Sequence, residues 1–312
     1  MSGKIFVGTC SWTDPTLLRS GFYPREVNTP EKRLRFYASH FPIVEVDSSY
    51  YALPAPETVG QWCQRTPPNF VFDVKAYALF TQHPTPLKGL PKDIQEELPT
   101  AIRAKANVYL KDVPPPVAQE IWQRFQEALL PLDSAGKLGV VLFQFPEWFV
   151  PRRDSYQYLL ACREKLPQYT VAVEFRHGTW LAEERQERLF HFLRENGLAY
   201  VSVDEPQGFP SSLPPIVQTT SHTAVVRFHG RNRETWRTRG ITAAQRFDYI
   251  YGEEELREWV PKVKDLREAA REVHVLFNNC YSDKAVTNAR DFSHLLTQEG
   301  ILPPPEESQN ML

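Results

Sequence analysis

The chain has 312 residues, of which 42% are hydrophobic and 24% charged, so it can bury a core large enough for one big α/β domain or two ordinary ones. Its 36 basic and 38 acidic residues leave a formal net charge of −2, so the chain lacks the net positive charge that is typical of many nucleic-acid and membrane-surface binders. Any site for a polyanion must therefore be local.

The cysteines and the first residues indicate the compartment. The four cysteines lie far apart and form no CxxC pair, which argues against a zinc cluster and a secreted disulfide framework; they are Cys10, Cys63, Cys162 and Cys280. The opening MSGKIFVGTCSW is too short and too polar for a signal peptide, and the longest apolar run, 140–145, is far below a membrane span. We expect a cytoplasmic protein with no membrane partner.

Eight short runs rich in Val, Ile and Phe alternate along the chain with segments of helical apolar spacing. The runs cover residues 5–12, 44–51, 70–77, 138–145, 170–177, 199–205, 224–231 and 273–279. Thr29 and Pro30 indicate a helix start before the second run, and Pro261 predicts an interruption in the helix before the last. This alternation predicts an α/β fold, a closed (β/α)₈ barrel of TIM type, with a doubly wound sheet as the alternative.

The spacing of the runs also predicts the domain organisation. We expect a single barrel domain over residues 1–302. The interval at about 78–137, after the third strand, is too long for one crossover, so it predicts a helical insertion that covers one rim. The tail, 303–312, has a composition typical of disorder.

The predicted strands end in polar side chains spaced by two. VAVEFRHG at 171–178, for example, begins like a buried strand and ends in three ionisable residues. Residues two apart face the same side of a strand, and the carboxyl ends of barrel strands open into the mouth where active sites lie. The sequence therefore predicts one pocket lined by Glu45, Asp47, Asp73, Lys75, Gln144, Glu174, Arg176, Ser202, Asp204, Arg227, His229 and Asn279.

Nine segments, in this order over nearly the whole chain, resemble the DUF72 family, also called YecE-like or UPF0759. They are FVGTCSWTDP, GFYP, FPIVEVDSSYYALP, TPPNFVFDVKA, LFQFPEWF, VAVEFRHGTW, RFHGRN, FDYIYGEEELREW and LFNN. The resemblance implies a (β/α)₈ barrel and assigns no catalytic residue. This chain has Asp47 and Ala52 where the family often has Asn and Arg.

The candidate catalytic residues are Glu174, Asp204, His229 and Lys75. Crowded carboxylates in a partly dry pocket separate in pKa, so one can act as an acid while another acts as a base. Lys75, with Arg176 and Arg227, would hold an anion or a developing negative charge. The alternative is that these charges only neutralise one another, through a Glu174–Arg227 or an Asp204–Arg176 bridge.

The candidate substrate-binding residues are Trp12, Asp47, Tyr51, Gln144, Arg176, His177, Arg227, Arg231, Asn278 and Asn279. Trp12 and Tyr51 follow strand ends and either stack on a ligand or pack in the core. His177 faces the opposite side from Glu174, and its alternative role is to cap the following helix. The loop 229–240 carries four arginines and predicts a phosphate or carboxylate site in which Gly230 brings backbone amides near the anion, unless the arginines pair with Asp248 or with 253–255.

The leading functional hypothesis is an enzyme that applies acid/base chemistry to an anionic small molecule, phosphorylated or carboxylated, without a tightly bound cofactor. A divalent metal held by Glu45, Glu174, Asp204 and His229 stays an alternative, weakened by the basic residues in the same pocket. Two further hypotheses are a metal-dependent phosphodiester enzyme of the endonuclease-barrel type, acting on nucleic acid, and a non-catalytic ligand-binding barrel. The choice between hydrolase, lyase and isomerase, and the oligomeric state, stay open.

Overall fold

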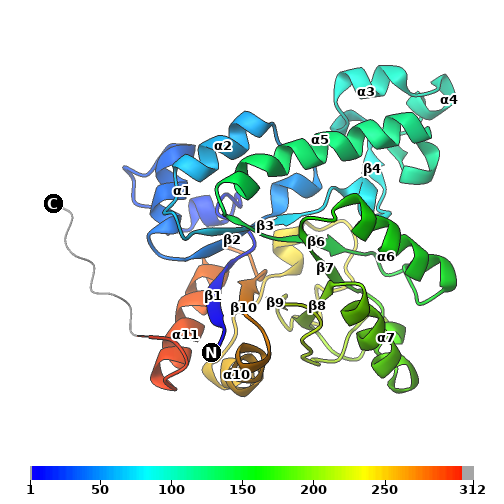
Figure 1. Ribbon diagram of the computed structural model, residues 1–312. Coiled ribbons are helices and arrows are strands. Elements are labelled where there is room, and N and C mark those ends of the chain that lie inside the picture. The colour runs from blue at the N-terminus through cyan, green and yellow to red at the C-terminus, as the bar shows by residue number, and fades with distance from the viewer. Residues whose placement is uncertain (1, 304–312) are drawn as a thin grey trace.

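The computed structural model describes residues 2–303 and contains a closed barrel of eight parallel strands (Figure 1). Around the barrel the strand order is β1-β10-β9-β8-β7-β6-β3-β2. The bounds are β1 Lys4–Thr9, β2 Ile43–Val46, β3 Val71–Lys75, β6 Leu138–Gln144, β7 Thr170–Glu174, β8 Leu198–Asp204, β9 Thr223–Phe228 and β10 Glu272–Phe277. Each predicted run overlaps one of these strands, so the predicted (β/α)₈ barrel is confirmed. From residue 304 onward the predicted tail lies outside the described residues.

Helices cover the outside of the barrel. The main ones are α1 Pro30–Ala38, α2 Pro56–Gln64, α5 Pro115–Ser134, α6 Arg153–Lys165, α7 Glu183–Glu195, α10 Val260–Ala269 and α11 Lys284–Gln298. Helix α1 begins as predicted, because the Thr29 side chain accepts a hydrogen bond from the Lys32 amide and Pro30 occupies the first turn. The connection from β8 to β9, residues 205–222, contains no helix. No described helix combines the length and the apolar character needed to cross a membrane.

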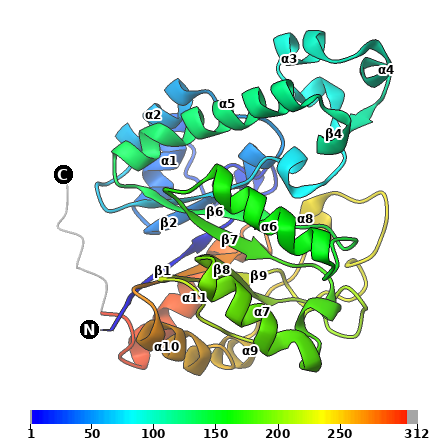
Figure 2. The ribbon, with the colours of Figure 1, turned by 45° about the vertical axis from the view of Figure 1, so that its right-hand side comes forward.

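The segment after β3 holds an insertion and a barrel helix. It contains a two-stranded antiparallel ribbon, β4 Thr85–Pro86 with β5 Asn107–Val108, and the short helices α3 Lys92–Glu97 and α4 Thr100–Arg103. Figures 1 and 2 show α3 and α4 at one end of α5, away from the barrel strands. Helix α5 runs back beside α2 as the crossover to β6. The short helices therefore lie beside the barrel, and the insertion reaches the mouth through His83.

The lower half of the barrel interior holds a buried ion pair. His274 Nδ1 on β10 lies 3.0 Å from both carboxylate oxygens of Asp73 on β3, and Asp73 also accepts a hydrogen bond from the Val140 amide. A Cβ at Gly139 would lie 2.2 Å from Asp73 Oδ1, so the absence of a side chain there makes room for the pair. Asp73 therefore fills the barrel interior below the mouth.

Candidate functional site

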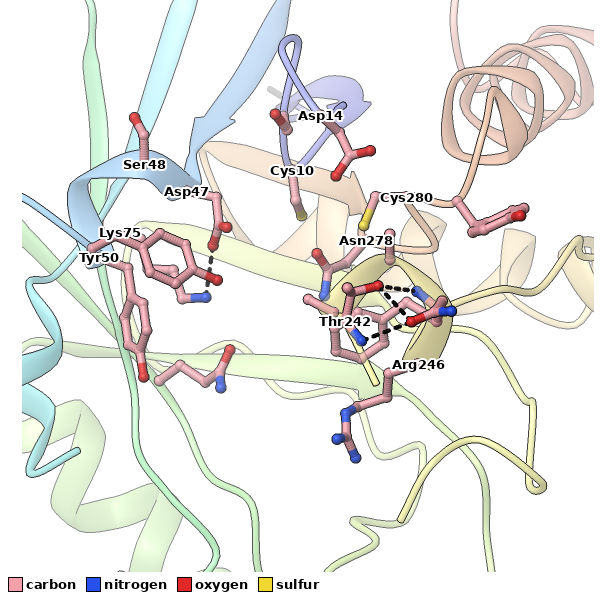
Figure 3. A pocket seen from close by; sticks show the side chains of 18 of the residues that line it. Cys10, Asp14, Asp47, Ser48, Tyr50, Lys75, Thr242, Arg246, Asn278 and Cys280 are labelled. Atoms are coloured by element: carbon pink, nitrogen blue, oxygen red, sulfur yellow. Dashed lines mark hydrogen bonds and ion pairs between the residues drawn. The ribbon is translucent and has the colours of Figure 1, made fainter. Parts of the chain in front are cut away.

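A cavity of about 1140 Å³ opens at the carboxyl ends of the strands. Every barrel strand contributes to its lining through its last residue or its following loop. Figure 3 shows Asp47, Tyr50 and Lys75 on one side of this cavity, with Thr242 and Arg246 on the other. The site is therefore built from segments far apart in sequence, as expected for the C-terminal face of a barrel.

Arg227 on β9 forms the centre of a charged layer beneath the cavity. Its guanidinium is fully buried, donates to Glu45 Oε1 on β2 at 2.8 Å, and pairs with Glu174 Oε2 on β7. It also lies 3.4 Å from Gln144 Oε1 and 3.6 Å from Cys10 Sγ. Because a buried guanidinium needs several acceptors, these partners fix its position under the floor of the cavity.

Arg176 connects this layer to the cavity. Its Nε lies 2.6 Å from Glu174 Oε1, its Nη1 donates to Glu205 Oε2 at 3.0 Å, and its guanidinium carbon lies 5.5 Å from the centre of the Trp236 ring. The Arg176 side chain is 10% exposed and lines the cavity. Two carboxylates and one ring therefore hold this cation at the cavity floor.

His229 packs against the same guanidinium. Its Nε2 lies 3.1 Å from Arg176 Nη2 and 3.2 Å from Glu174 Oε1, and its Nδ1 lies 2.9 Å from Asn278 Nδ2. Burial, with Arg176 nearby, lowers the pKa of His229 to about 3, so the ring is neutral near pH 7. A neutral ring can accept from one neighbour while it donates to another, which suits a position between Asn278 and Glu174.

Lys75 and Asp47 form the second charged pair of the floor. Lys75 Nζ donates to Asp47 Oδ1 at 2.7 Å and lies 4.6 Å from the centre of the Tyr50 ring. The Lys75 side chain is 11% exposed and that of Asp47 is 31% exposed. Burial alone would lower the pKa of Lys75, but Asp47 and Glu45 raise it above its usual range, so the ammonium is charged at neutral pH.

The carboxyl groups of the buried layer differ in proton affinity. Burial raises the pKa of Glu45 to about 7, against the opposing effect of Arg227, and likewise raises that of Glu205 to about 7, against Arg176. Burial opposes the ionisation of Glu174 too, but Arg176 and Arg227 together hold its pKa well below the usual range. Glu174 is thus the ionised carboxylate between the two arginines, while Glu45 and Glu205 titrate near neutral pH.

The fold agrees with the comparison to known proteins. Residues 6–310 match the family described as "Protein of unknown function DUF72". The chain belongs to the DUF72 family. It is 31% identical over 306 residues to the UPF0759 protein YunF of Bacillus subtilis, covering 96% of this chain and 98% of that protein. It is 26% identical over 202 residues to the UPF0759 protein YecE of Escherichia coli, covering 64% of this chain and 59% of that protein.

Two solved DUF72 structures share the fold. The DUF72 family protein from Thermotoga maritima is 32% identical, with a TM-score of 0.73 over 94% of this chain and 99% of that chain. The one from Enterococcus faecalis is 26% identical, with a TM-score of 0.71 over 95% of this chain and 98% of that chain.

Most of the predicted site residues of this DUF72 chain meet at the mouth. Those that line the cavity are Trp12, Asp47, Tyr51, Lys75, Gln144, Arg176 and Asn278. Glu174, Arg227 and His229 lie directly beneath, in the buried layer. The predicted Glu174–Arg227 bridge is present. These three residues are therefore one step removed from any ligand in the cavity.

Asp204 does not face the mouth, contrary to the prediction. It pairs in register with Phe228, which packs outside the barrel on Trp259. Side-by-side residues of parallel strands face the same side, so Asp204 also points outward, where it accepts hydrogen bonds from Trp259 Nε1 and the Tyr251 hydroxyl, both at 2.8 Å. The inward residue is Glu205, and it forms the bridge to Arg176 that the sequence pattern predicts for Asp204.

Four other expectations for the rim are not met. Arg231 and Gly230 do not line the cavity: Arg231 is held by Asp204 at 2.7 Å and by Glu258 at 2.8 Å, and the Gly230 amide donates to the Tyr251 hydroxyl. His177 takes its alternative role, since its side chain accepts from the Thr179 amide and caps the turn that follows β7. Asn279 is fully buried and donates to the Tyr249 carbonyl and to Asn288 Oδ1.

Sequence reasoning missed Glu205 and several aromatic residues of the cavity wall, namely Tyr50, His83, Trp148 and Trp236. Tyr50 lies at the end of the predicted run 44–51, and Trp148 follows the predicted run 138–145 by three residues, so their position near strand ends was the available signal. His83 and Trp236 lie well inside long connections between strands, so the sequence alone does not indicate that they reach the mouth.

The donor set does not favour a metal. Among residues 2–303, no group of three or more His, Cys, Asp or Glu side chains is placed to hold a metal ion. The candidate ligands Glu45, Glu174 and His229 are instead engaged with Arg227, Arg176 or Asn278, and Asp204 points away. The arrangement is better suited to holding an anion on Lys75 and Arg176 than to holding a cation.

Proposed function

We propose that this DUF72 protein is an enzyme that binds an anionic small molecule, phosphorylated or carboxylated, at the barrel mouth and transfers a proton to or from it. The observation that carries this proposal is the pair of cations at the cavity floor, Lys75 and Arg176. Both are about nine-tenths buried, and both line the cavity. Charge-assisted hydrogen bonds from such preorganised cations are the strong ones.

The proposed chemistry is assigned to Lys75 and Asp47. The charged Lys75 stabilises a ligand atom that develops negative charge, and Asp47 is the partly exposed carboxylate that accepts a proton from the ligand. Glu174 and His229 are positioning residues in this proposal, because they contact Arg176 rather than the cavity. Asp204, which points away, has no part in it.

A thermal-shift titration with inorganic phosphate tests the anion site. Protein treated with a chelator should melt higher as phosphate is added; at ten times the Kd the gain is about 1.4 kcal/mol, or about 2 °C for a chain of this size. The shift should disappear in Lys75→Met and persist in the control Lys264→Met, which removes an exposed lysine of α10. A shift with Mn²⁺ but none with any anion would favour the metal-dependent alternative.

A second measurement separates an enzyme from a binding protein. Metabolites retained by the chelator-treated protein can be identified by mass spectrometry and then incubated with fresh protein. Conversion of a retained anion by the wild type, and its loss in Lys75→Met, is the expected result. Retention with no conversion would support the non-catalytic barrel.

A further inference from the structure

One wall of the cavity is a continuous row of four rings. The ring of Tyr51 lies 5.0 Å from that of Tyr50, Tyr50 lies 5.4 Å from His83, and His83 lies 5.9 Å from Trp148, all centre to centre and edge-on. The four residues come from the loops after three different strands, β2, β3 and β6. All four line the cavity. The row therefore exists only because the fold assembles it.

The two ends of the row are open to solvent. Tyr51 and Trp148 are each 58% exposed, which makes them the most exposed of the four large hydrophobic side chains at the surface of residues 2–303. Exposed large aromatic groups beside a concave polar site are typical of ligand-binding surfaces. The row is also uncharged, because burial, with Lys75 and Arg176 nearby, lowers the pKa of His83 to about 4.

The row adjoins the anion site. Lys75 Nζ lies over the Tyr50 ring at 4.6 Å, and the electrostatic effect of both floor cations reaches His83. An anionic group held by Lys75 thus lies beside the middle of the row. The cavity, about 1140 Å³, is also far larger than a bare phosphate or a small carboxylic acid requires, since pockets that bind drug-sized ligands measure about 300–1,000 Å³. The wall therefore has room beside it for the rest of a larger ligand.

We propose that the ligand of this mouth is a ring-bearing anion, whose phosphate or carboxylate binds Lys75 and whose flat ring face packs on the row Tyr51–Tyr50–His83–Trp148. The proposal rests on the function proposed above and specifies its substrate class. An aromatic ring stacks on such side chains through its π face, and a sugar ring packs on them through its C–H face. Both kinds of ring therefore present an uncharged surface that can pack on the row.

Three phosphate esters test the proposal by calorimetry at equal ionic strength: 4-methylumbelliferyl phosphate with an aromatic ring, glucose 6-phosphate with a sugar ring, and glycerol 3-phosphate with no ring. At least one ring-bearing ester should bind about tenfold more tightly than glycerol 3-phosphate, the advantage expected of one stacked ring. The ester that shows this advantage identifies the ring as aromatic or as a sugar.

Three variants show which side chains cause a difference in affinity between the esters. The double variant Tyr51→Ala/Trp148→Ala changes two exposed side chains and should lose the ring advantage while it keeps the affinity for glycerol 3-phosphate. The control Leu130→Ala removes an exposed apolar side chain on α5, outside this cavity, and should change nothing. Lys75→Met should weaken the binding of all three esters.

The outcomes separate the two proposals. Equal affinities for the three esters, or a ring advantage that survives in the double variant, would overturn the ring-bearing ligand and leave the anion site intact. Failure of all three esters and of inorganic phosphate to bind would overturn the proposed function, and with it this inference.

Discussion

At the scale of single residues, the charged ends of the barrel strands form a connected layer rather than a set of independent groups. Arg227 sits inside the barrel with no exposed surface and is held by Glu45 and Glu174. Arg176 shares Glu174 and carries the charge up to the cavity floor. A buried ion pair gains little over an apolar core, so such a layer is best explained by the cation that it presents to the cavity.

Glu174→Gln should destabilise the protein by about 3–5 kcal/mol, because it leaves two buried guanidiniums with one carboxylate fewer. Urea denaturation gives the free energy of unfolding. The matched control is Glu147→Gln, which breaks the half-exposed pair with Arg237 at the rim and should cost less than about 1 kcal/mol. A Glu174→Gln protein as stable as the wild type would show that the layer does not depend on this carboxylate.

The Asp73–His274 pair predicts a pH dependence of stability. Burial would lower the pKa of His274, but Asp73 and Glu272 raise it to about 9, above the 6.5 of a free histidine. The stability that the charged ring contributes is therefore fully present below about pH 6.5 and is lost as the pH rises through about 9, a change of about 2–3 kcal/mol.

Urea denaturation at pH 6.5 and at pH 9 measures this change. The Asp73→Asn/His274→Gln double variant removes both charges and should show a loss smaller by that amount. An equally steep loss in the double variant would assign the pH dependence to other groups.

At the scale of elements, the strands were predictable and the direction of one strand's side chains was not. In β7 and β9 one charged residue ends a buried apolar run, and an ionisable residue follows two positions later, so the spacing itself indicates which residues face inward. In β8 all seven residues are buried, and the polar Ser202 and Asp204 lie on the outward face, under the covering segments. The positions of the polar residues therefore predicted the wrong inward face for β8. Asp204 was expected to face the mouth, and Glu205, one residue later, does so.

Among the connections between strands, a helix boundary was predictable and the contacts of the rim loops were less so. The interruption predicted at Pro261 is present, since α9 Glu253–Arg257 ends before α10 begins. The rim loops were only partly predictable: the alternative pairing of the loop arginines with 253–255 is present as Arg231–Glu255, but the shorter pairs of Arg231 with Asp204 and Glu258 were not predicted. Long-range pairing of this kind leaves no local pattern in the sequence.

Asp204 ties β8 to the start of α10, and this role predicts the effect of its removal. Asp204→Asn should lower the free energy of unfolding by about 2–4 kcal/mol, since Arg231 and Trp259 lose an ionised acceptor. The phosphate-induced rise in melting temperature should stay as in the wild type, because the side chain faces away from the cavity. If the variant had normal stability but its melting temperature no longer rose with phosphate, Asp204 would belong to the binding site after all.

At the scale of the whole molecule, the barrel brings two separately compensated cations to one floor and an aromatic row to the adjoining wall. Lys75 ends β3 and Arg176 follows β7, the two strands that flank β6 in the barrel, so both cations reach the same cavity. The eight-strand alternation in the sequence was sufficient to predict the closed barrel. The aromatic wall depends on His83 in the insertion, and its place in the cavity required the structure.

The most direct measurement is an anomalous difference map from crystals of chelator-treated protein soaked in selenate, a tetrahedral anion that resembles phosphate. The anion site proposed here predicts the strongest peak at the cavity floor, within about 3–4 Å of Lys75 Nζ or of the Arg176 guanidinium. A strongest peak on the arginine-rich loop 229–240, with none at the floor, would contradict it.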